Sequence, residues 1–243
     1  DTSTNSDNNS LNYYEINELD SSDTNNRSYI VEHIDLELLW VEPGTYPRPK
    51  GTENVEIHTG FWLGKHEVTV AQWKNVMGQY GESFSANRRR FKRDDIPVVM
   101  ISYDEINEFC RKITEIERNA GRLPDGLSFQ LPNDIQWEIA CLAGTKTIHP
   151  FGEKQGLNQA NVKDKYFFYS SAVGEPTNVG NYPPNRWGFH DMIGNVWEMC
   201  YNVSRGHQNA LSREGLDTVP KGGSYKYLLS SSLVPIRGKQ IFK

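Results

Sequence analysis

The stretch from Lys221 to Ser232, KGGSYKYLLSSS, gathers side chains that could line a binding cleft. It contains no Cys, His, Asp or Glu, so it offers no thiolate, imidazole or carboxylate for redox, metal or acid–base chemistry. Aromatic rings and small hydroxyls make adaptable contacts instead. We therefore expect a recognition surface at Tyr225, Tyr227, Ser230, Ser231 and Ser232. The alternative is that Tyr225 and Leu228 fill the core while Tyr227 and the serines face solvent.

The chain's three cysteines, at 110, 141 and 200, are too few and too widely spaced for a disulfide framework or a zinc site. Cys110 and Cys141 fall within helical patterns, which favours buried small apolar side chains. The six histidines are scattered too, and we expect His190 to pack rather than to bind a metal. No Ser-His-Asp spacing and no pair of carboxylates stands out, although such sites also assemble from distant residues.

Three capping boxes predict the helices that must position the candidate binding residues and the cysteines. They pair Thr69 with Gln72, Ser102 with Glu105, and Asn133 with Gln136. The helices should end at Gly78, near Ala120 and at Gly144. Strands are predicted within 34–46 and 54–69, in IPVVMIS (96–102) and in LSFQLP (127–132). After Gly144 no long periodic segment follows, and loops of this length usually carry function or bind ions.

The composition is that of a soluble globular chain, with 37% hydrophobic and 23% charged residues. A net charge of −5 leaves no electrostatic footprint for nucleic acid. No apolar run is long enough to span a membrane. Residues 1–28 are rich in Asn, Ser and Asp, which predicts a flexible tether in which LNYYEI packs locally. We expect a single folded domain over 29–243.

Several motifs occur in the order found in one protein family: GFWLGKHEVTVAQW, IPVVMISYDEINEFC, LPNDIQWEIACLAGT, PPNRWGFHDMIGNVWEMC and KGGSY. With these motifs the chain resembles the sulfatase-modifying-factor family, that of the formylglycine-generating enzyme, from about Leu38 to Arg237. The resemblance implies an α+β fold, a variant of the C-type lectin fold with little regular secondary structure. It implies a small mixed sheet, two or three helices and long packed loops. The closing strand of the family is missing from the sequence pattern.

For metals, the resemblance implies calcium held by loop oxygens, the ligands that this ion prefers. The residues that match the family's turn are Gly194, Asn195, Val196 and Glu198. The alternative is that Asn195 and Glu198 tie loops together by hydrogen bonds. A second calcium site would use Asn161 and Val162, but the acid expected further along is not in register, and Asp164 or Glu175 would have to replace it.

The resemblance fails at the catalytic centre. Formylglycine-generating enzymes carry two cysteines after the GGS motif, and these bind copper and the substrate thiol. The matching positions here are Tyr227 and Ser232, while Leu228 and Leu229 replace the family's His and Arg. Soft thiolates are what Cu(I) requires. We therefore expect no bound copper and no formylglycine-generating activity.

Two classes of function remain. The first is a non-catalytic binding or scaffold protein that recognises a protein, peptide or small molecule outside the cytoplasm, secreted or tied to the envelope through an upstream lipid anchor. The second is a metal-dependent enzyme of the same superfamily with non-thiol chemistry. The tyrosines and serines near Gly223 favour the first.

Overall fold

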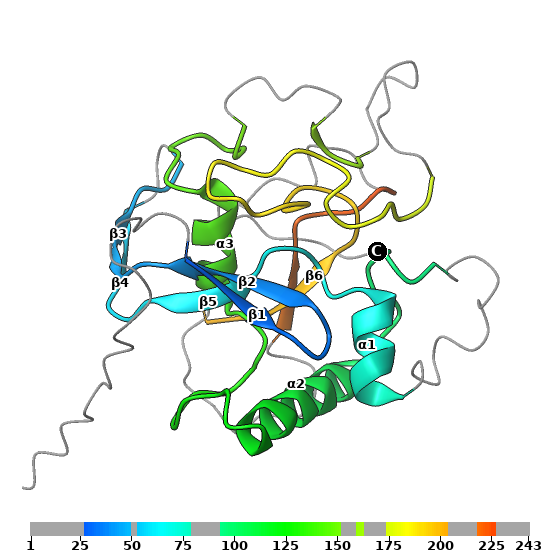
Figure 1. Ribbon diagram of the computed structural model, residues 1–243. Helices are drawn as coiled ribbons and strands as arrows, with labels where there is room; N and C mark the ends of the chain where they lie inside the picture. Colours follow the sequence, from blue (N-terminus) through cyan, green and yellow to red (C-terminus); the bar gives the residue numbers. More distant parts are fainter. Residues whose placement is uncertain are drawn as a thin grey trace, which may run out of the picture.

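The computed structural model describes residues 27–49, 53–78, 93–151, 159–162, 174–203 and 218–226. In this part of the chain three helices and seven short strands form an α+β fold with long connecting loops (Figure 1). The helices are α1 (Val70–Met77), α2 (Tyr103–Asn119) and α3 (Asp134–Leu142). Residues 227–243, where the family's closing strand is expected to be missing, lie outside the described residues, as do residues 1–26 of the predicted tether.

All three predicted capping boxes are confirmed at the helix starts. Thr69, Ser102 and Asn133 each accept a hydrogen bond from the backbone of the third helical residue, whose side chain returns a bond to the cap. These reciprocal bonds satisfy amides that a helix start otherwise leaves without partners. At the other end of α1, Gly78 adopts a left-handed conformation, with φ of 78°, as predicted. The N-terminal caps therefore determine where each of the three helices begins.

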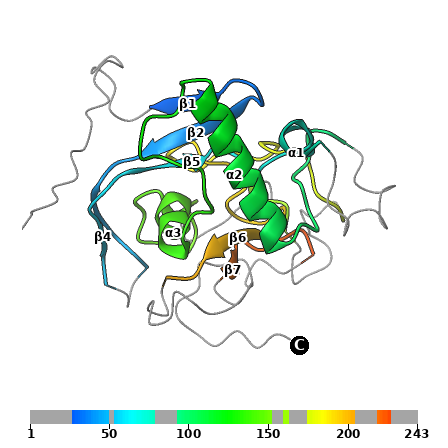
Figure 2. The same cartoon turned by 90° about the horizontal axis from the view of Figure 1, so that it is seen from below.

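The described strands form three antiparallel sheets rather than the single mixed sheet expected. β1 (Ser28–Val31), β2 (Leu36–Val41) and β5 (Phe61–Gly64) make one sheet with β2 in the middle. β3 (Gly44–Tyr46) pairs with β4 (Val55–Ile57), and β6 (Glu198–Tyr201) pairs with β7 (Thr218–Lys221). The β6–β7 ribbon lies beside α3 (Figure 2).

Two predicted strands are wrong. Residues 96–102 make only an isolated bridge between Pro97 and Thr69, because Pro97 has no N–H and its partner becomes α1 at Val70. Residues 127–132 join no sheet, and the Phe129 N–H donates instead to Thr114 Oγ1 on α2. Their apolar pattern reflects packing against a helix, which periodicity alone does not distinguish from a strand.

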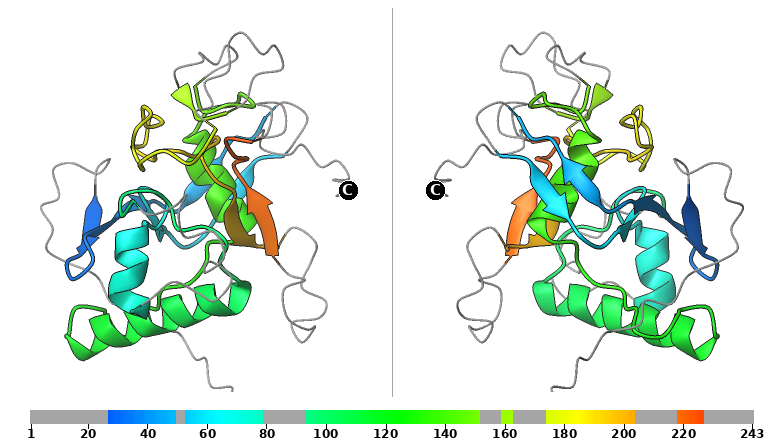
Figure 3. Two further views of the ribbon diagram at one scale, coloured as in Figure 1. Left: turned by 90° about the vertical axis from the view of Figure 1, so that its right-hand side faces the viewer. Right: turned by 90° about the vertical axis from the view of Figure 1, so that its left-hand side faces the viewer.

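The core has two main clusters, and β2 contributes to both. Leu39 and Val41 pack with the fully buried Trp137 of α3. Leu36 packs with Trp73 of α1 and Phe109 of α2, whose rings stack at 5.0 Å. Figure 3 shows the resulting division, with α1 and α2 together on one side and α3 beside β6–β7 on the other. The loops that carry the predicted metal ligands lie against the Trp137 cluster.

Candidate functional site

The turn from Asp191 to Glu198 has a backbone that only particular residues adopt easily. Asp191 and Asn195 both have positive φ, 54° and 49°, which short polar side chains tolerate better than most. Gly194 has a φ of 90°, and a Cβ there would lie 2.5 Å from the carbonyl oxygen of Asn161. The GN pair thus lets this turn approach the Asn161 loop, and Asn195 N–H donates to the same Asn161 oxygen at 3.0 Å.

The side chain of Asn195 is completely buried and fully engaged by neighbouring loops. Its Oδ1 accepts from Asn161 Nδ2 at 3.2 Å, from Thr177 N–H at 3.0 Å and from Thr177 Oγ1 at 3.2 Å. Its Nδ2 donates to Glu67 Oε2 at 3.2 Å. Because three donors already point at Oδ1, this atom is poorly placed to bind a cation, and Asn195 fits the role of a loop tie.

Three carboxyl groups lie close to the same turn. Glu67 precedes α1, Asp191 begins the turn and Glu198 begins β6. Burial raises the pKa of Glu67 well above its usual value, and the charges of Asp191 and Glu198 raise it further. Burial also raises the pKa of Asp191 to about 6 and that of Glu198 to about 8. Each group is therefore costly to ionise without a compensating positive charge.

Several oxygens of this cluster lack a hydrogen-bond donor. Glu67 Oε1 and Asp191 Oδ1 are buried and have no hydrogen-bond partner in the described part of the chain, while Asp191 Oδ2 accepts from Gly180 N–H at 2.7 Å. Among the described residues no donor reaches the carbonyls of Gly194 and Val196, whereas the Asn195 carbonyl accepts from Tyr225 N–H. Carboxylate and carbonyl oxygens of this kind suit calcium. No group of three or more His, Cys, Asp or Glu in the described part is arranged to hold a metal, so carbonyls would have to complete any such site.

The second predicted calcium position is also tied by hydrogen bonds. Asn161 Nδ2 donates to the Glu175 carbonyl at 3.0 Å as well as to Asn195. Both Asn161 and Val162 are buried. Asp164 lies outside the described residues, so a calcium ion at this position stays a prediction.

The glycine pair of the GGS motif leads into a buried segment. Gly222 and Gly223 have φ of 83° and 85°, as the predicted tight turn requires. Gly194 N–H donates to the Gly222 carbonyl, and this hydrogen bond ties the segment to the turn from Asp191 to Glu198. Tyr225 is only 8% exposed and fills the core, as the alternative interpretation held. The remaining predicted contacts, Tyr227 and Ser230–Ser232, lie outside the described residues.

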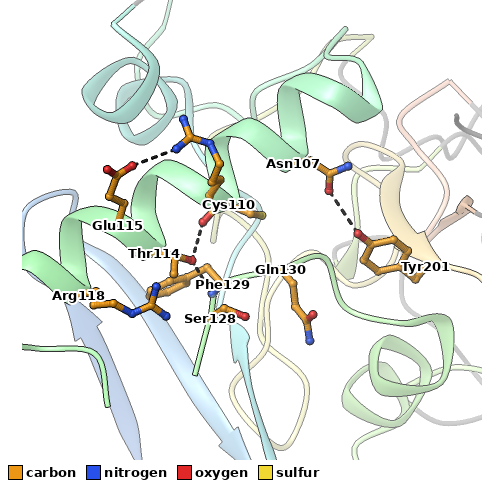
Figure 4. A pocket seen from close by; sticks show the side chains of 10 residues that line it. Asn107, Cys110, Thr114, Glu115, Arg118, Ser128, Phe129, Gln130 and Tyr201 are labelled. Atoms are coloured by element: carbon orange, nitrogen blue, oxygen red, sulfur yellow. Dashed lines mark hydrogen bonds and ion pairs between the residues drawn. The ribbon is translucent and has the colours of Figure 1, made fainter. Parts of the chain in front are cut away.

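A groove of about 530 Å³ lies elsewhere, along α2 (Figure 4). Its lining includes Asn107, Cys110 and Arg118 from the helix, Phe129 from the following segment, and Tyr201 from β6. Neither Tyr225 nor any residue of the acidic cluster lines it. Sequence reasoning misses this groove, because the apolar pattern of residues 127–132 predicts a strand rather than a segment that packs on α2.

Reasoning from sequence also missed Asp191 and Glu67 as members of the acidic cluster. Asp191 could have been found from its position three residues before Gly194, in the same motif. Glu67 had no such signal, because it precedes Asn195 by 128 residues and only the fold brings the two side chains together.

Comparison with known proteins places this chain in a family. The model of the sulfatase-modifying factor enzyme 1-like domain matches residues 33–242. The chaperone protein LppX of Paenibacillus barcinonensis is 25% identical over 84% of this chain and 83% of its own length. The formylglycine-generating enzyme of Mycobacterium tuberculosis is 33% identical over 65% of this chain, and that of the mouse is 28% identical over 68%. The matches span 52% and 42% of those two enzymes.

Solved structures show the same fold. Treponema denticola variable protein 1 superposes with a TM-score of 0.62 at 19% identity, covering 86% of this chain and 91% of that protein. PvdO from Pseudomonas aeruginosa gives a TM-score of 0.63 at 15% identity, covering 88% and 91%. The family match over most of the chain shows that it belongs to the sulfatase-modifying factor enzyme 1-like, or formylglycine-generating-enzyme-like, domain family.

Proposed function

We propose that this domain is a recognition module of its family that does not oxidise a substrate thiol with copper. The observation that carries the proposal is the placement of the three thiols of the chain. Cys141 and Cys200 are completely buried, in α3 and β6, and Cys110 lies on α2 in the groove. None belongs to the GGS segment.

Their surroundings keep all three thiols protonated. Burial raises the pKa of Cys110 to about 11, and burial also raises the pKa values of Cys141 and Cys200 well above that of a free thiol. Copper(I) binding and disulfide exchange both require thiolates that a substrate can reach. A thiol-based copper centre would therefore need accessible cysteines at the GGS segment, and this segment contains none.

The same segment supports recognition. The buried residues Lys221–Tyr225 hold the chain firmly, and it turns outward at the exposed Lys226. Side chains that follow a fixed anchor lose less entropy when they bind. We propose that Tyr227 and Ser230–Ser232 use this anchor to contact a protein or peptide. The relative LppX is named a chaperone protein, which agrees with such a role.

Calcium is proposed as a structural ion of this module. The ligands would be the carboxylates of Asp191 and Glu198 with the carbonyls of Gly194 and Val196. In this set Asp191 replaces the side chain of Asn195, whose oxygen already accepts three hydrogen bonds. A bound divalent cation would supply the positive charge that the buried carboxylates lack.

The location outside the cytoplasm is part of the proposal and depends on the polar composition of residues 1–28. In the part of the chain that the structure describes, no helix is long and apolar enough to cross a membrane. The alternative, a metal-dependent enzyme, would need acid–base groups that face a cleft. The carboxyl groups of Glu67, Asp191 and Glu198 do not line the groove on α2.

The first test is chemical. The purified protein, supplied with copper and a sulfatase-type cysteine peptide, should give no formylglycine by mass spectrometry, while the Mycobacterium tuberculosis enzyme serves as the positive control. Product above a no-protein control would overturn the proposal.

The second test concerns recognition. Peptides selected by phage display on the whole chain should bind Tyr227→Ala at least tenfold more weakly, about 1.4 kcal/mol. The matched control is His58→Ala, whose side chain is 81% exposed after β4. Equal binding by both variants would exclude Tyr227 from the recognition surface.

A further inference from the structure

The groove along α2 has two chemically different ends (Figure 4). At one end Tyr201 donates to Asn107 Oδ1 at 3.3 Å, and at the other end Arg118 reaches over to the carbonyl of Leu127 at 2.9 Å. Between them lie the half-buried Phe129 and the thiol-bearing Cys110. Arg111 and Glu115 also line the groove, but they pair with each other at 3.0 Å. The groove therefore combines an apolar middle with one end at which the guanidinium of Arg118 is not matched by a described carboxylate.

Polar groups on its rim are available to a ligand. Arg118 makes no ion pair with any described residue, in contrast to Arg111, which pairs with Glu108 at 2.8 Å and Glu115 at 3.0 Å. Ser128 and Gln130 are exposed and form no hydrogen bond within the described part of the chain. A chain laid along 128–130 could thus bond to backbone groups and place an acidic side chain at Arg118.

The sequence contains a segment with this chemistry. All large apolar residues of the first 26 positions fall in one nine-residue stretch, Leu11–Leu19, LNYYEINEL. This stretch carries Glu15 and Glu18, and residues 1–26 hold six acids and no Lys or Arg. It is short, apolar at its centre and acidic, and it complements both the middle and the Arg118 end of the groove.

The start of β1, to which the N-terminal segment is joined, lies at the C-terminal end of α2, where Arg118 is. Tyr29 of β1 donates its hydroxyl toward Glu117 Oε2 and the Arg122 carbonyl, both at 3.4 Å, at the C-terminal end of α2. Arg118 belongs to the same turn. The groove extends along α2 from there to Asn107, about 17 Å at 1.5 Å per residue. The eight residues between Leu19 and Ser28 span up to about 26 Å when extended, so Leu11–Leu19 can reach it.

We propose that Leu11–Leu19 of the same chain occupies the α2 groove, with tyrosine and isoleucine side chains over Phe129 and Cys110 and an acidic side chain at Arg118. The N-terminal segment then covers the α2 groove, which is separate from the GGS segment. The proposal does not depend on the function proposed above.

Cys110 provides the readout, because it is the thiol in the groove while Cys141 and Cys200 are completely buried. The full chain is alkylated with a maleimide, and each cysteine is followed by mass spectrometry. The variant Tyr13→Ser/Tyr14→Ser/Ile16→Ser should raise the alkylation rate of Cys110 about tenfold, equivalent to about 1.4 kcal/mol of docking. The matched variant Asn5→Ser/Asn8→Ser/Asn9→Ser should leave the rate unchanged.

Charge reversal tests the orientation. Arg118→Glu should also expose Cys110, and adding Glu15→Lys/Glu18→Lys should restore protection. Unchanged labelling of Cys141 and Cys200 shows that the fold is intact in each variant. Equal Cys110 rates in the wild type and the serine triple variant would overturn the proposal. Protection that depends on protein concentration would overturn it as well, since the occupant would then be a second copy.

Discussion

The side chains of Asn161 and Asn195 form a direct hydrogen bond, 3.2 Å from Nδ2 to Oδ1, although 34 positions separate them in the chain. Both residues are completely buried, and the backbone repeats the contact, since Asn195 N–H donates to the Asn161 carbonyl. This double link holds two irregular loops together where no sheet is present. The loops that surround the acidic cluster are thus ordered by amide side chains.

Removing the Asn195 side chain should therefore destabilise the fold strongly. Asn195→Ala leaves the donors of Asn161 and Thr177 without their acceptor, and each buried unsatisfied group costs about 1–3 kcal/mol. We expect a loss of about 3 kcal/mol or more in the free energy of unfolding, measured by urea denaturation. Asn195→Gly relieves the positive φ but loses the same acceptor, so it should be almost as damaging. A loss under about 1 kcal/mol in both variants would contradict the role of this side chain.

Gly194 should tolerate no side chain. In Gly194→Ala the Cβ would lie 2.5 Å from the Asn161 carbonyl oxygen at a φ of 90°, so the variant should lose about 3–5 kcal/mol from strain and overlap. Gly126→Ala is the matched control, because its φ is 81° but nothing lies within 4 Å of the added carbon. The control should lose only about 1–2 kcal/mol by the same urea measurement. Similar losses in the two variants would mean that the approach to Asn161 is not tight.

The helices were predictable because their signals are local. Each capping box uses residues three apart, and the apolar stripe of α2, Ile106, Phe109 and Ile113, faces the core as its spacing predicts. β6 and β7 were not predicted, because their pairing depends on Glu198 meeting Lys221, which lies 23 positions further along the chain. Strand pairing between distant residues leaves little trace in either segment alone.

The candidate site was only partly predictable for a similar reason. Gly194, Val196 and Glu198 stand together in one motif, and the structure places them in one turn. The partners of Asn195 come from three other segments, through Glu67, Asn161 and Thr177. Whether a polar side chain binds a metal or a neighbouring amide depends on these distant partners, which the motif does not contain.

Calcium should stabilise the wild-type protein through Asp191 and Glu198. By mass action the gain is about 2.7 kcal/mol at a hundredfold excess over Kd. Asp191→Asn keeps an oxygen for the Gly180 N–H but loses the charge, so its melting temperature should no longer rise with calcium. Glu56→Gln, an exposed substitution on β4, should respond like the wild type. A melting temperature that EDTA does not change in the wild type would contradict calcium binding at this turn.

In EDTA, stability should fall as the pH rises from 6.5 to 8. Burial raises the pKa of Glu198 to about 8 in the folded state from an ordinary value of 4.5, so the folded state holds the extra proton. A raised pKa contributes stability at low pH, and this contribution is lost as the pH rises through the folded-state value. Glu67, with its pKa raised by burial, acts in the same direction.

This pH range avoids the opposing effect of His66, whose ring packs against that of His190 with ring centres 4.7 Å apart and planes tilted by 31°. Burial lowers the pKa of His66 to about 4 in the folded state. Below the ordinary value of 6.5 the unfolded chain therefore takes up a proton that the folded protein does not, so His66 lowers the stability only as the pH falls below 6.5. Thermal melts of the wild type in EDTA should therefore decline between pH 6.5 and 8, and Glu198→Gln should decline less because that proton no longer titrates. Excess calcium should offset the decline in the wild type, since the ion replaces protons on the carboxylates. A wild-type melting temperature that rises across this window in EDTA would show that the cluster ionises without cost.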